Sequence, residues 1–261
     1  MVDQVDRRVE GHHVNTVEFD FSGSRVLVTG GTSGIGNAIA TDFARAGALV
    51  IITGTRGSAG DYDDDLSAFD YRQCQLSDLG SVDALAASLD GLDVLINNAG
   101  APYAGGKDEW DPEGYAGSIE VNMFAPMRLT MACHEKLRAS TAVGGASVVT
   151  IVSMSAFVSA IAVPAYSSAK AGLVALTRNL SRRWVGDGIR VNAVAPGLID
   201  TRTTHPVLDI PELLEPEMRH TPMARMGMPD EVSGAVLFLS ADAARYITGT
   251  TLAVDGGYLT V

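Results

Sequence analysis

Tyr166 and Lys170 are the two residues whose types and spacing could most directly do chemistry. They lie four residues apart in Tyr166-Ser167-Ser168-Ala169-Lys170, inside a stretch, 166–184, that has helical periodicity. Residues four apart on a helix share one face, about 6 Å apart along the axis. A phenol ordinarily titrates near pH ~10, but a neighbouring ammonium favours the phenolate. The pair therefore predicts acid–base catalysis, with Tyr166 as proton donor and acceptor.

A glycine-rich turn follows the first predicted strand and opens a predicted helix. It reads Thr29-Gly30-Gly31-Thr32-Ser33-Gly34-Ile35-Gly36. The missing side chains let the backbone approach a pyrophosphate, whose charge is favoured by free N–H groups and the positive end of the helix dipole. In this strand–turn–helix context the turn predicts a dinucleotide site. Its expected cofactor-binding residues are Gly30, Thr32, Ser33, Gly34, Ile35 and Gly36.

These two motifs resemble those of the short-chain dehydrogenase/reductase family, whose turn has the form Thr-Gly-x-x-x-Gly-x-Gly and whose catalytic pair has the form Tyr-x-x-x-Lys. Asn97-Asn98-Ala99-Gly100 resembles the family's Asn-Asn-Ala-Gly segment, and Ser153 precedes the tyrosine by thirteen residues. Asn122, in Val121-Asn122-Met123, matches the fourth catalytic position. The resemblance runs from residue 21 to the end of the chain, and implies the catalytic set Asn122, Ser153, Tyr166 and Lys170.

The resemblance also implies roles for these residues. Ser153 hydrogen-bonds the substrate oxygen, Lys170 also holds the nicotinamide ribose, and Asn122 anchors a water through which protons reach solvent. Two further segments are implied to contact the cofactor. The first segment holds Asn98, Ala99 and Gly100, and the second holds Pro196, Gly197, Ile199 and Thr201. In the second segment, Ile199 and Thr201 are implied to face the nicotinamide carboxamide.

The elements that must position these residues alternate between strand and helix. β-branched, mostly continuous apolar runs predict strands at residues 25–29, 49–53, 93–97, 147–153, 189–194 and 250–254. Helical periodicity predicts helices at residues 35–46, 82–89, 115–138, 166–184 and 230–240. The alternation predicts a single Rossmann-like α/β domain over residues 22–261, a doubly wound parallel sheet of about seven strands flanked by helices.

Three segments fall outside this alternation. Residues 1–21 lack the apolar run of a secretory signal and are expected to be an N-terminal tail. Residues 57–70 hold Asp61, Asp63, Asp64 and Asp65 and are expected to be a loop. Residues 198–227 contain four prolines, and are expected to be irregular or only briefly helical, forming a lid over the substrate.

The nucleotide preference depends on the end of the second predicted strand. NAD-preferring members of the family carry an acidic residue there, but this sequence has Gly54, followed by Thr55 and Arg56. A guanidinium suits the 2′-phosphate of NADP through paired charge-assisted hydrogen bonds. NADP(H) is therefore favoured modestly over NAD(H), although Arg56 could equally be a solvated surface residue. Leu76, after Gln75, is the expected adenine contact.

Composition and charge exclude several other classes of protein. The net charge of -12 argues against nucleic acid as a partner. No uninterrupted apolar run is long enough to span a membrane. Cys74 and Cys133 lie in no metal-ligand pattern and fit a reducing compartment, so we expect a cytoplasmic protein. The aspartates of 57–70 lack calcium-loop spacing and the histidines are scattered, so no metal is assigned.

The predicted function is hydride transfer between a nicotinamide cofactor and a small ketone or secondary alcohol. Apolar residues expected around the pocket suit a hydrophobic or cyclic substrate; they are Tyr103, Met154, Ala156, Phe157, Val158, Leu198, Val207, Leu208, Leu213, Leu214 and Met218. Two alternatives stay open, a 3-oxoacyl-carrier-protein reductase and a non-catalytic NAD(P)-sensing regulator. The acidic composition argues mildly against the first, and the intact catalytic set argues against the second. The resemblance also implies a homotetramer.

Overall fold

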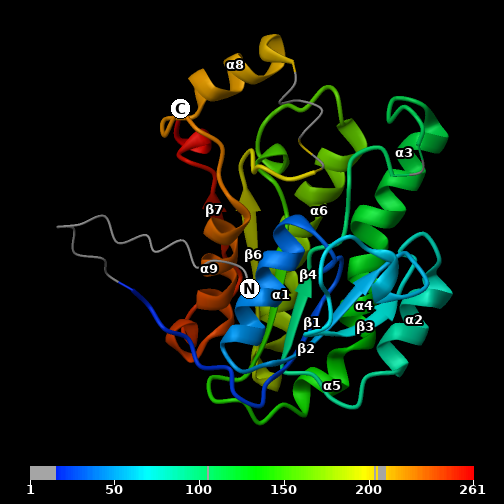
Figure 1. The fold of residues 1–261 in the computed structure, drawn as a ribbon, viewed down its shortest axis with the longest axis vertical. Coiled ribbons are helices and arrows are strands. Elements are labelled where there is room, and N and C mark those ends of the chain that lie inside the picture. The colour runs from blue at the N-terminus through cyan, green and yellow to red at the C-terminus, as the bar shows by residue number, and fades with distance from the viewer. Residues whose placement is uncertain (1–15, 105, 203, 205–209) are drawn as a thin grey trace.

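The computed structural model describes residues 16–104, 106–202, 204 and 210–261. Its centre is one sheet of seven parallel strands in the order β3-β2-β1-β4-β5-β6-β7 (Figure 1). The strands are β1 Arg25–Val28, β2 Leu49–Gly54, β3 Asp70–Gln73, β4 Val94–Asn97, β5 Ala146–Ile151, β6 Ile189–Pro196 and β7 Thr251–Val254. The predicted doubly wound parallel sheet is confirmed.

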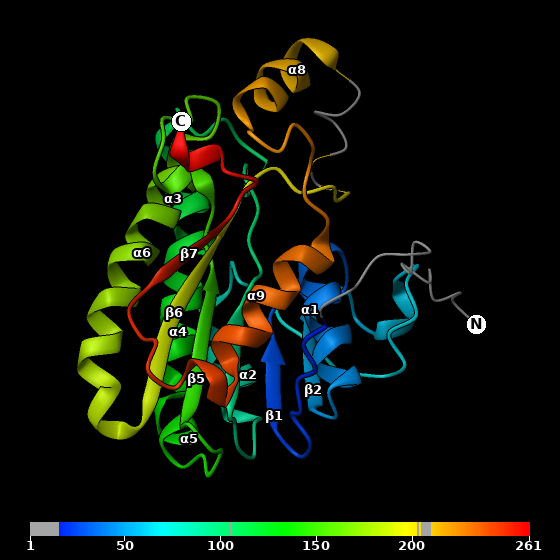
Figure 2. The same ribbon diagram turned by 90° about the vertical axis from the view of Figure 1, so that its left-hand side faces the viewer.

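Helices cover both faces of the sheet, as Figure 2 shows. The helices are α1 Gly34–Arg45, α2 Leu79–Ala87, α3 Pro112–Ile119, α4 Ala125–Ala132, α5 His134–Arg138, α6 Pro164–Trp184, α8 Pro211–His220 and α9 Pro229–Ser240. Val26 and Val28 face one core layer with α1 and α9, whereas Leu27 faces the other with α2, α4 and α6. Because both faces are buried, the central strands are apolar without alternation.

The strand β3 was not among the six predicted strands. Its sequence, Asp-Tyr-Arg-Gln, holds one apolar residue, and it lies at the edge of the sheet with none of its four residues fully buried. Strand periodicity arises from burial, so a polar edge strand carries little of it. The segment 57–70 is otherwise a loop, as expected, with one short turn of helix at Ala59–Asp61.

The predicted helix at residues 115–138 is wrong as a single element. It divides into α3, a π-helical turn at Glu120–Phe124 (η2), α4 and the short α5. Amphipathic periodicity does not distinguish a continuous helix from one that contains a π turn, because the apolar face continues through the turn.

The segment 198–227, the predicted lid, is more helical than its prolines predict. Pro211 stands in the first turn of α8, where the missing N–H costs nothing, and the helix runs ten residues despite Pro216 in its interior. In Figure 1, α8 lies beyond the carboxyl ends of the strands. Val207 and Leu208 lie outside the described residues.

At the other end, Phe21, the last residue of the predicted tail, is buried and packs edge-on against Phe43 with ring centroids 4.8 Å apart. Residues 1–15 of that tail lie outside the described residues.

Candidate active site

The glycine-rich turn lies between β1 and α1, at the point where the strand order reverses. β1 pairs with β2 on one side and with β4 on the other, and open α/β sheets bind ligands outside the carboxyl ends at such a switch point. Gly30 and Gly34 have φ of +64° and +55°, a backbone conformation that favours glycine. No side chain of a described residue caps the start of α1, so its first N–H groups are available to a ligand.

Gly36 shows why this turn excludes side chains. A Cβ atom there would lie 2.3 Å from the carbonyl oxygen of Gly30 and 2.4 Å from Nδ2 of Asn98. The backbone and helix end therefore form the kind of cradle that a pyrophosphate needs.

The Asn98-Ala99-Gly100 segment is joined to the turn by hydrogen bonds. Asn98 Nδ2 donates to the carbonyls of Thr29 and Gly30, at 2.9 and 3.2 Å. The hydroxyl of Thr29 accepts from the backbone N–H groups of Asn98 and Ala99, both at 3.0 Å. Thr29, the first residue of the turn but not one of its predicted cofactor-binding residues, thus fixes β1 to the end of β4.

The segment after β6 approaches the turn from the lid side. A Cβ atom on Gly34 would lie 3.3 Å from the Cγ2 atom of Thr201. Ile199, by contrast, is buried in the core against Gly227. The side chain of Ile199 is thus packed against Gly227, and the side chain of Thr201 lies beside Gly34 of the turn.

Tyr166 and Lys170 lie on one face of α6, as their spacing predicts. The Nζ atom of Lys170 is 5.4 Å from the centroid of the Tyr166 ring and donates to the carbonyl of Ile151 at 2.9 Å. Burial lowers the pKa of Lys170 to about 8 and raises the pKa of Tyr166 to about 12. The sequence predicts a lowered pKa for Tyr166; in the structure the pKa is raised instead, because the enclosed phenolate loses its solvation.

Ser153 lies just beyond β5 and beside Tyr166. Its hydrogen bond to Tyr166 lowers the tyrosine pKa, partly opposing the effect of burial. The Ser153 oxygen accepts from the N–H and the hydroxyl of Ser155, at 3.1 and 2.9 Å. With its oxygen held in this way, Ser153 keeps its own proton free to donate. Sequence reasoning missed Ser155.

Asn122 is fully buried within the π-helical turn η2. Its Oδ1 accepts from the N–H of Ala101 at 3.0 Å, and its Nδ2 donates to the Ala101 carbonyl at 2.9 Å. A Cβ atom on Gly100 would meet both Asn122 Oδ1, at 2.6 Å, and Lys170 Nζ, at 3.4 Å. The tertiary structure therefore brings the four predicted catalytic residues to one end of the sheet. A π turn at a functional residue is a common arrangement.

Comparison with known proteins agrees with this geometry. A family model described as enoyl-(acyl carrier protein) reductase matches residues 30–259. A tropinone reductase homologue of Arabidopsis thaliana is 35% identical, covering 92% of this chain and 94% of its own. The 2-dehydro-3-deoxy-D-gluconate 5-dehydrogenase of Bacillus subtilis is 32% identical, covering 92% of this chain and 96% of its own.

Solved structures match equally well. The Pseudomonas aeruginosa RhlG/NADP active-site complex has a TM-score of 0.82 and 29% identity, covering 92% of this chain and 98% of that one. The protein belongs to the short-chain dehydrogenase/reductase family. It is an NAD(P)-dependent oxidoreductase acting on CH–OH and C=O groups.

In this short-chain dehydrogenase/reductase, the region after β2 differs from an acidic NAD site. Tyr62, from the loop 57–70, places its hydroxyl 2.3 Å from where a Cβ on Gly54 would lie. The guanidinium of Arg56 stacks over the Tyr62 ring at 4.8 Å and donates to the Asp61 carbonyl. Arg56 is therefore held beside the end of β2. Leu76, the predicted adenine contact, is half-buried against the core.

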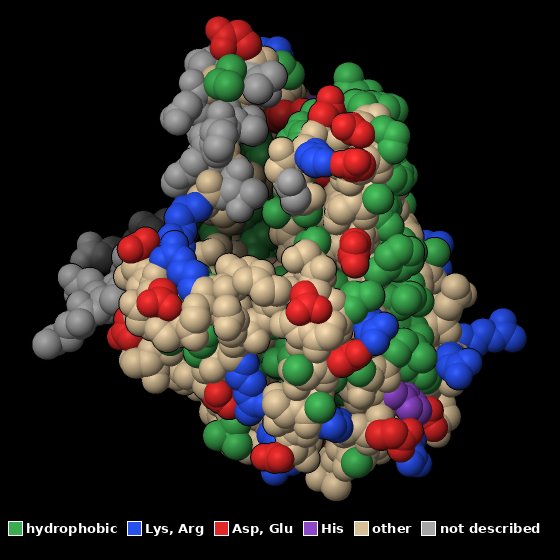
Figure 3. Space-filling view, turned by 90° about the vertical axis from the view of Figure 1, so that its right-hand side faces the viewer, with side chains coloured by type: hydrophobic (Ala, Val, Ile, Leu, Met, Phe, Trp, Pro, Cys, Tyr) green, Lys and Arg blue, Asp and Glu red, His purple; other side chains and the backbone are tan. Residues whose placement is uncertain are grey.

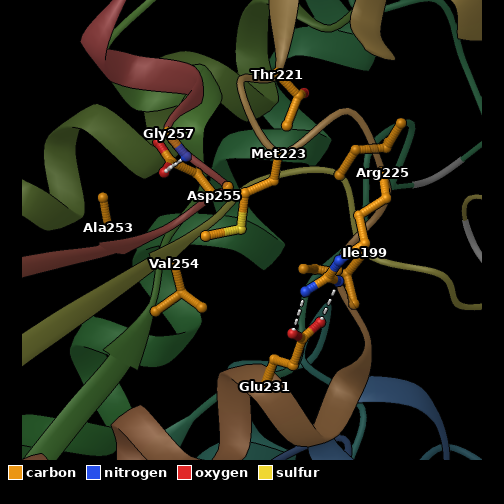
Figure 4. Close-up of a pocket in the computed structure, with 12 residues that line it drawn as sticks. Ile199, Thr221, Met223, Arg225, Glu231, Ala253, Val254, Asp255 and Gly257 are labelled. Atoms are coloured by element: carbon orange, nitrogen blue, oxygen red, sulfur yellow. Dashed lines mark hydrogen bonds and ion pairs between the residues drawn. The ribbon is translucent and has the colours of Figure 1, made fainter.

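A pocket of about 300 Å³ lies between the segment 221–231 and the end of β7, as Figure 4 shows. None of the four catalytic residues lines it, although Ile199 does. Arg225 forms two hydrogen bonds, 2.8 and 2.6 Å long, with the carboxylate of Glu231 at the start of α9 (Figure 4). This ion pair ties the segment that carries Arg225 to the start of α9.

Several of the apolar residues that the sequence predicts around the substrate are accessible. Tyr103, Phe157 and Val158 expose large side chains to solvent. Leu214 and Met218 of α8 and Leu198 are partly buried. Among the described residues, no group of His, Cys, Asp and Glu could hold a metal ion, and no helix is long and apolar enough to cross a membrane.

Proposed function

We propose that this enzyme interconverts a hydrophobic or cyclic ketone and its secondary alcohol, with NADP(H) as the preferred cofactor. The observation that carries the proposal is the meeting of Ser153, Tyr166 and Lys170 beside exposed apolar side chains at the carboxyl end of the sheet. A pocket with one polar end and apolar walls selects such a substrate.

Each catalytic side chain has a role that its environment supports. The hydroxyl of Ser153 donates to the substrate oxygen, and Tyr166 gives its proton to the same oxygen. A pKa near 12 keeps Tyr166 protonated at neutral pH, as a proton donor in ketone reduction requires. The ammonium of Lys170 stabilises the phenolate that remains, and Asn122 holds the segment at Ala101 beside it. A nicotinamide, when bound, supplies or accepts the hydride.

The residues of the site fit a nicotinamide dinucleotide. The glycine turn leaves room for a pyrophosphate, and Arg56 lies at the end of β2, where a 2′-phosphate would need a cation. The solved complex of the Pseudomonas aeruginosa relative contains NADP, as do two others that are 33% and 32% identical. These observations support the preference for NADP(H).

The first experiment is a fluorescence titration of the protein with NADPH and with NADH. It is followed by turnover assays on cyclohexanone, 2-octanone and an acetoacetyl thioester. Tighter NADPH binding with turnover of the free ketones supports the proposal. Tighter NADH binding contradicts the cofactor preference. Turnover of the thioester alone favours the carrier-protein reductase, and binding without any turnover favours the sensing regulator.

Replacing Tyr166 with Phe tests the chemistry. Turnover should fall at least about 10³-fold, because the proton donor is lost, while the NADPH dissociation constant stays within about twofold. Retained turnover would contradict the assignment of Tyr166.

We also propose a homotetramer in the cytoplasm. Figure 3 shows hydrophobic side chains gathered along one side of the molecule, and Phe124 and Met131, of η2 and α4, are exposed. Light scattering after size-exclusion chromatography measures the assembly, and a monomer at micromolar concentration would contradict it.

A further inference from the structure

Glu109 is a buried carboxylate that has no part in the proposed proton transfer by the four catalytic residues. Its residue has 0% of its surface exposed. Each of its oxygens accepts two hydrogen bonds: Oε1 from the Tyr103 N–H at 2.9 Å and the Ser118 hydroxyl at 2.8 Å, and Oε2 from the N–H groups of Ala165 and Tyr166, both at 2.9 Å. Among the described ion pairs, no cation partners Glu109. Four donors therefore hold its charge.

One oxygen of Glu109 completes the start of the catalytic helix. Val163, at the N-cap of α6, makes no side-chain cap, and Pro164 has no N–H. The N–H groups of Ala165 and Tyr166 would otherwise be unpaired, which is costly for buried donors. The carboxylate pairs both and places its charge at the positive end of the helix dipole. It bonds the backbone of Tyr166 itself.

The other oxygen reaches two more parts of the site. Ser118, which donates to Glu109, accepts from Nδ2 of Asn122 at 3.2 Å. Tyr103 has a φ of +53°, an unfavourable conformation for a residue with a side chain. Its N–H bond to Glu109 and its hydroxyl bond to the Ala162 carbonyl, at 2.7 Å, hold it there.

We propose that Glu109 is a positioning residue that fixes Tyr166, Asn122 and Tyr103 in one arrangement and keeps a negative charge beside the catalytic phenol. This inference rests on the proposed proton transfer by Tyr166. Among the described residues, two charged groups lie beside Tyr166: Lys170, from its own helix, and Glu109, from the loop before α3. After burial, the charge of Glu109 is a further cause that raises the pKa of Tyr166.

Two variants separate the geometry from the charge. Glu109→Gln keeps the length but loses the charge, and its amide nitrogen opposes the Tyr103 N–H. Glu109→Asp keeps the charge but is one methylene too short to bridge both sides. The matched control is Glu113→Gln, since Glu113 lies exposed on α3 in an ion pair with Lys107.

The measurement is the pH profile of kcat for oxidation of the alcohol made from the best ketone of the panel above, together with NADPH affinity and melting temperature. We expect both Glu109 variants to lose about 10- to 100-fold in kcat with NADPH affinity within twofold. The midpoint of the oxidation profile should move down by roughly one pH unit in Glu109→Gln, because a like charge is removed, and stay unchanged in Glu109→Asp.

Two results would overturn the proposal. One is wild-type kcat and midpoint in both variants. The other is a loss of kcat matched by equal losses of cofactor affinity and melting temperature with no movement of the midpoint, which is a purely structural role. Tyr166→Phe, assayed alongside, separates these from failure of the proposed chemistry: if that variant turns over, the role of Tyr166 is wrong, whatever the Glu109 variants do.

Discussion

At the scale of single residues, burial decides how the catalytic groups hold their protons. The same enclosure raises the pKa of Tyr166 and lowers the pKa of Lys170, because the phenolate and the ammonium both lose solvation. Tyr166 is thereby kept as an acid, while Lys170 changes its charge close to working pH. For ketone reduction, the pH above which activity falls is therefore set by Lys170 rather than by the tyrosine.

This assignment predicts the pH dependence of ketone reduction. Below about 8, Lys170 is charged and stabilises the phenolate left after proton donation. As pH rises through that value the charge is lost, although Tyr166, with a pKa of about 12, still holds its proton. We expect kcat/KM for reduction to be flat from pH ~6 to 7.5 and to fall toward tenfold per unit above ~8. Saturation with NADPH must be checked at each pH. A flat profile to pH ~10 would contradict this role of Lys170.

At the scale of elements, the turn between β1 and α1 depends on closeness of backbone rather than on any side chain. Asn98 reaches across from β4 to the Gly30 carbonyl, and Gly36 must pass within contact of both. A methyl group added at Gly36 would therefore push the turn away from the end of β4. Gly234, in α9, is not constrained in this way, because a Cβ added there would meet nothing within 4 Å.

Gly36→Ala should weaken NADPH binding at least about tenfold and lower the free energy of unfolding by roughly 1–3 kcal/mol, because the new Cβ overlaps the Gly30 carbonyl. Gly234→Ala is the matched control, since Gly234 lies within α9 with nothing within 4 Å of its added Cβ. There, alanine should stabilise by about 0.5–1 kcal/mol. Titration with NADPH and urea unfolding measure both effects. Equal behaviour of the two variants would show that the turn does not need Gly36.

At the scale of the whole molecule, an ion pair joins the acidic loop 57–70 to the segment after β6. Arg202, after β6, pairs with Asp64 at 2.7 Å and lies 3.8 Å from Asp63, so two segments more than 130 residues apart are joined. The side chains of Arg202 and Asp64 are 52% and 48% exposed, so the pair is worth only about 0–1 kcal/mol and is sensitive to salt.

We expect Arg202→Ala to release NADPH about two- to fivefold faster in stopped-flow fluorescence at low salt, because the ion pair between Arg202 and Asp64 is lost. Asp64→Asn should have the same effect, and the double variant should be no faster than either single one. The difference should disappear in about 1 M salt. Slower release from Asp64→Asn than from the wild type would instead indicate that Arg202 binds the cofactor directly.

The sequence by itself determined the features that are local along the chain. The apolar central strands, the glycine turn and the spacing of Tyr166 and Lys170 each depend on residues within a few positions of one another, so their patterns predict structure directly. The positions of Ser153 and Asn122 followed from resemblance, and the structure brings both to the same end of the sheet.

The tertiary structure decided what depends on distant partners. Glu109 has no sequence signal because its hydrogen-bond donors lie up to 57 residues away, at the start of α6. Strand β3 exists because a neighbour supplies its hydrogen bonds, with no apolar periodicity to indicate it. The pKa of Tyr166 also depends on burial, which forms only when α6 packs beneath the loop that carries Glu109. Long-range contacts and desolvation belong to the folded chain, and no short stretch of sequence records them.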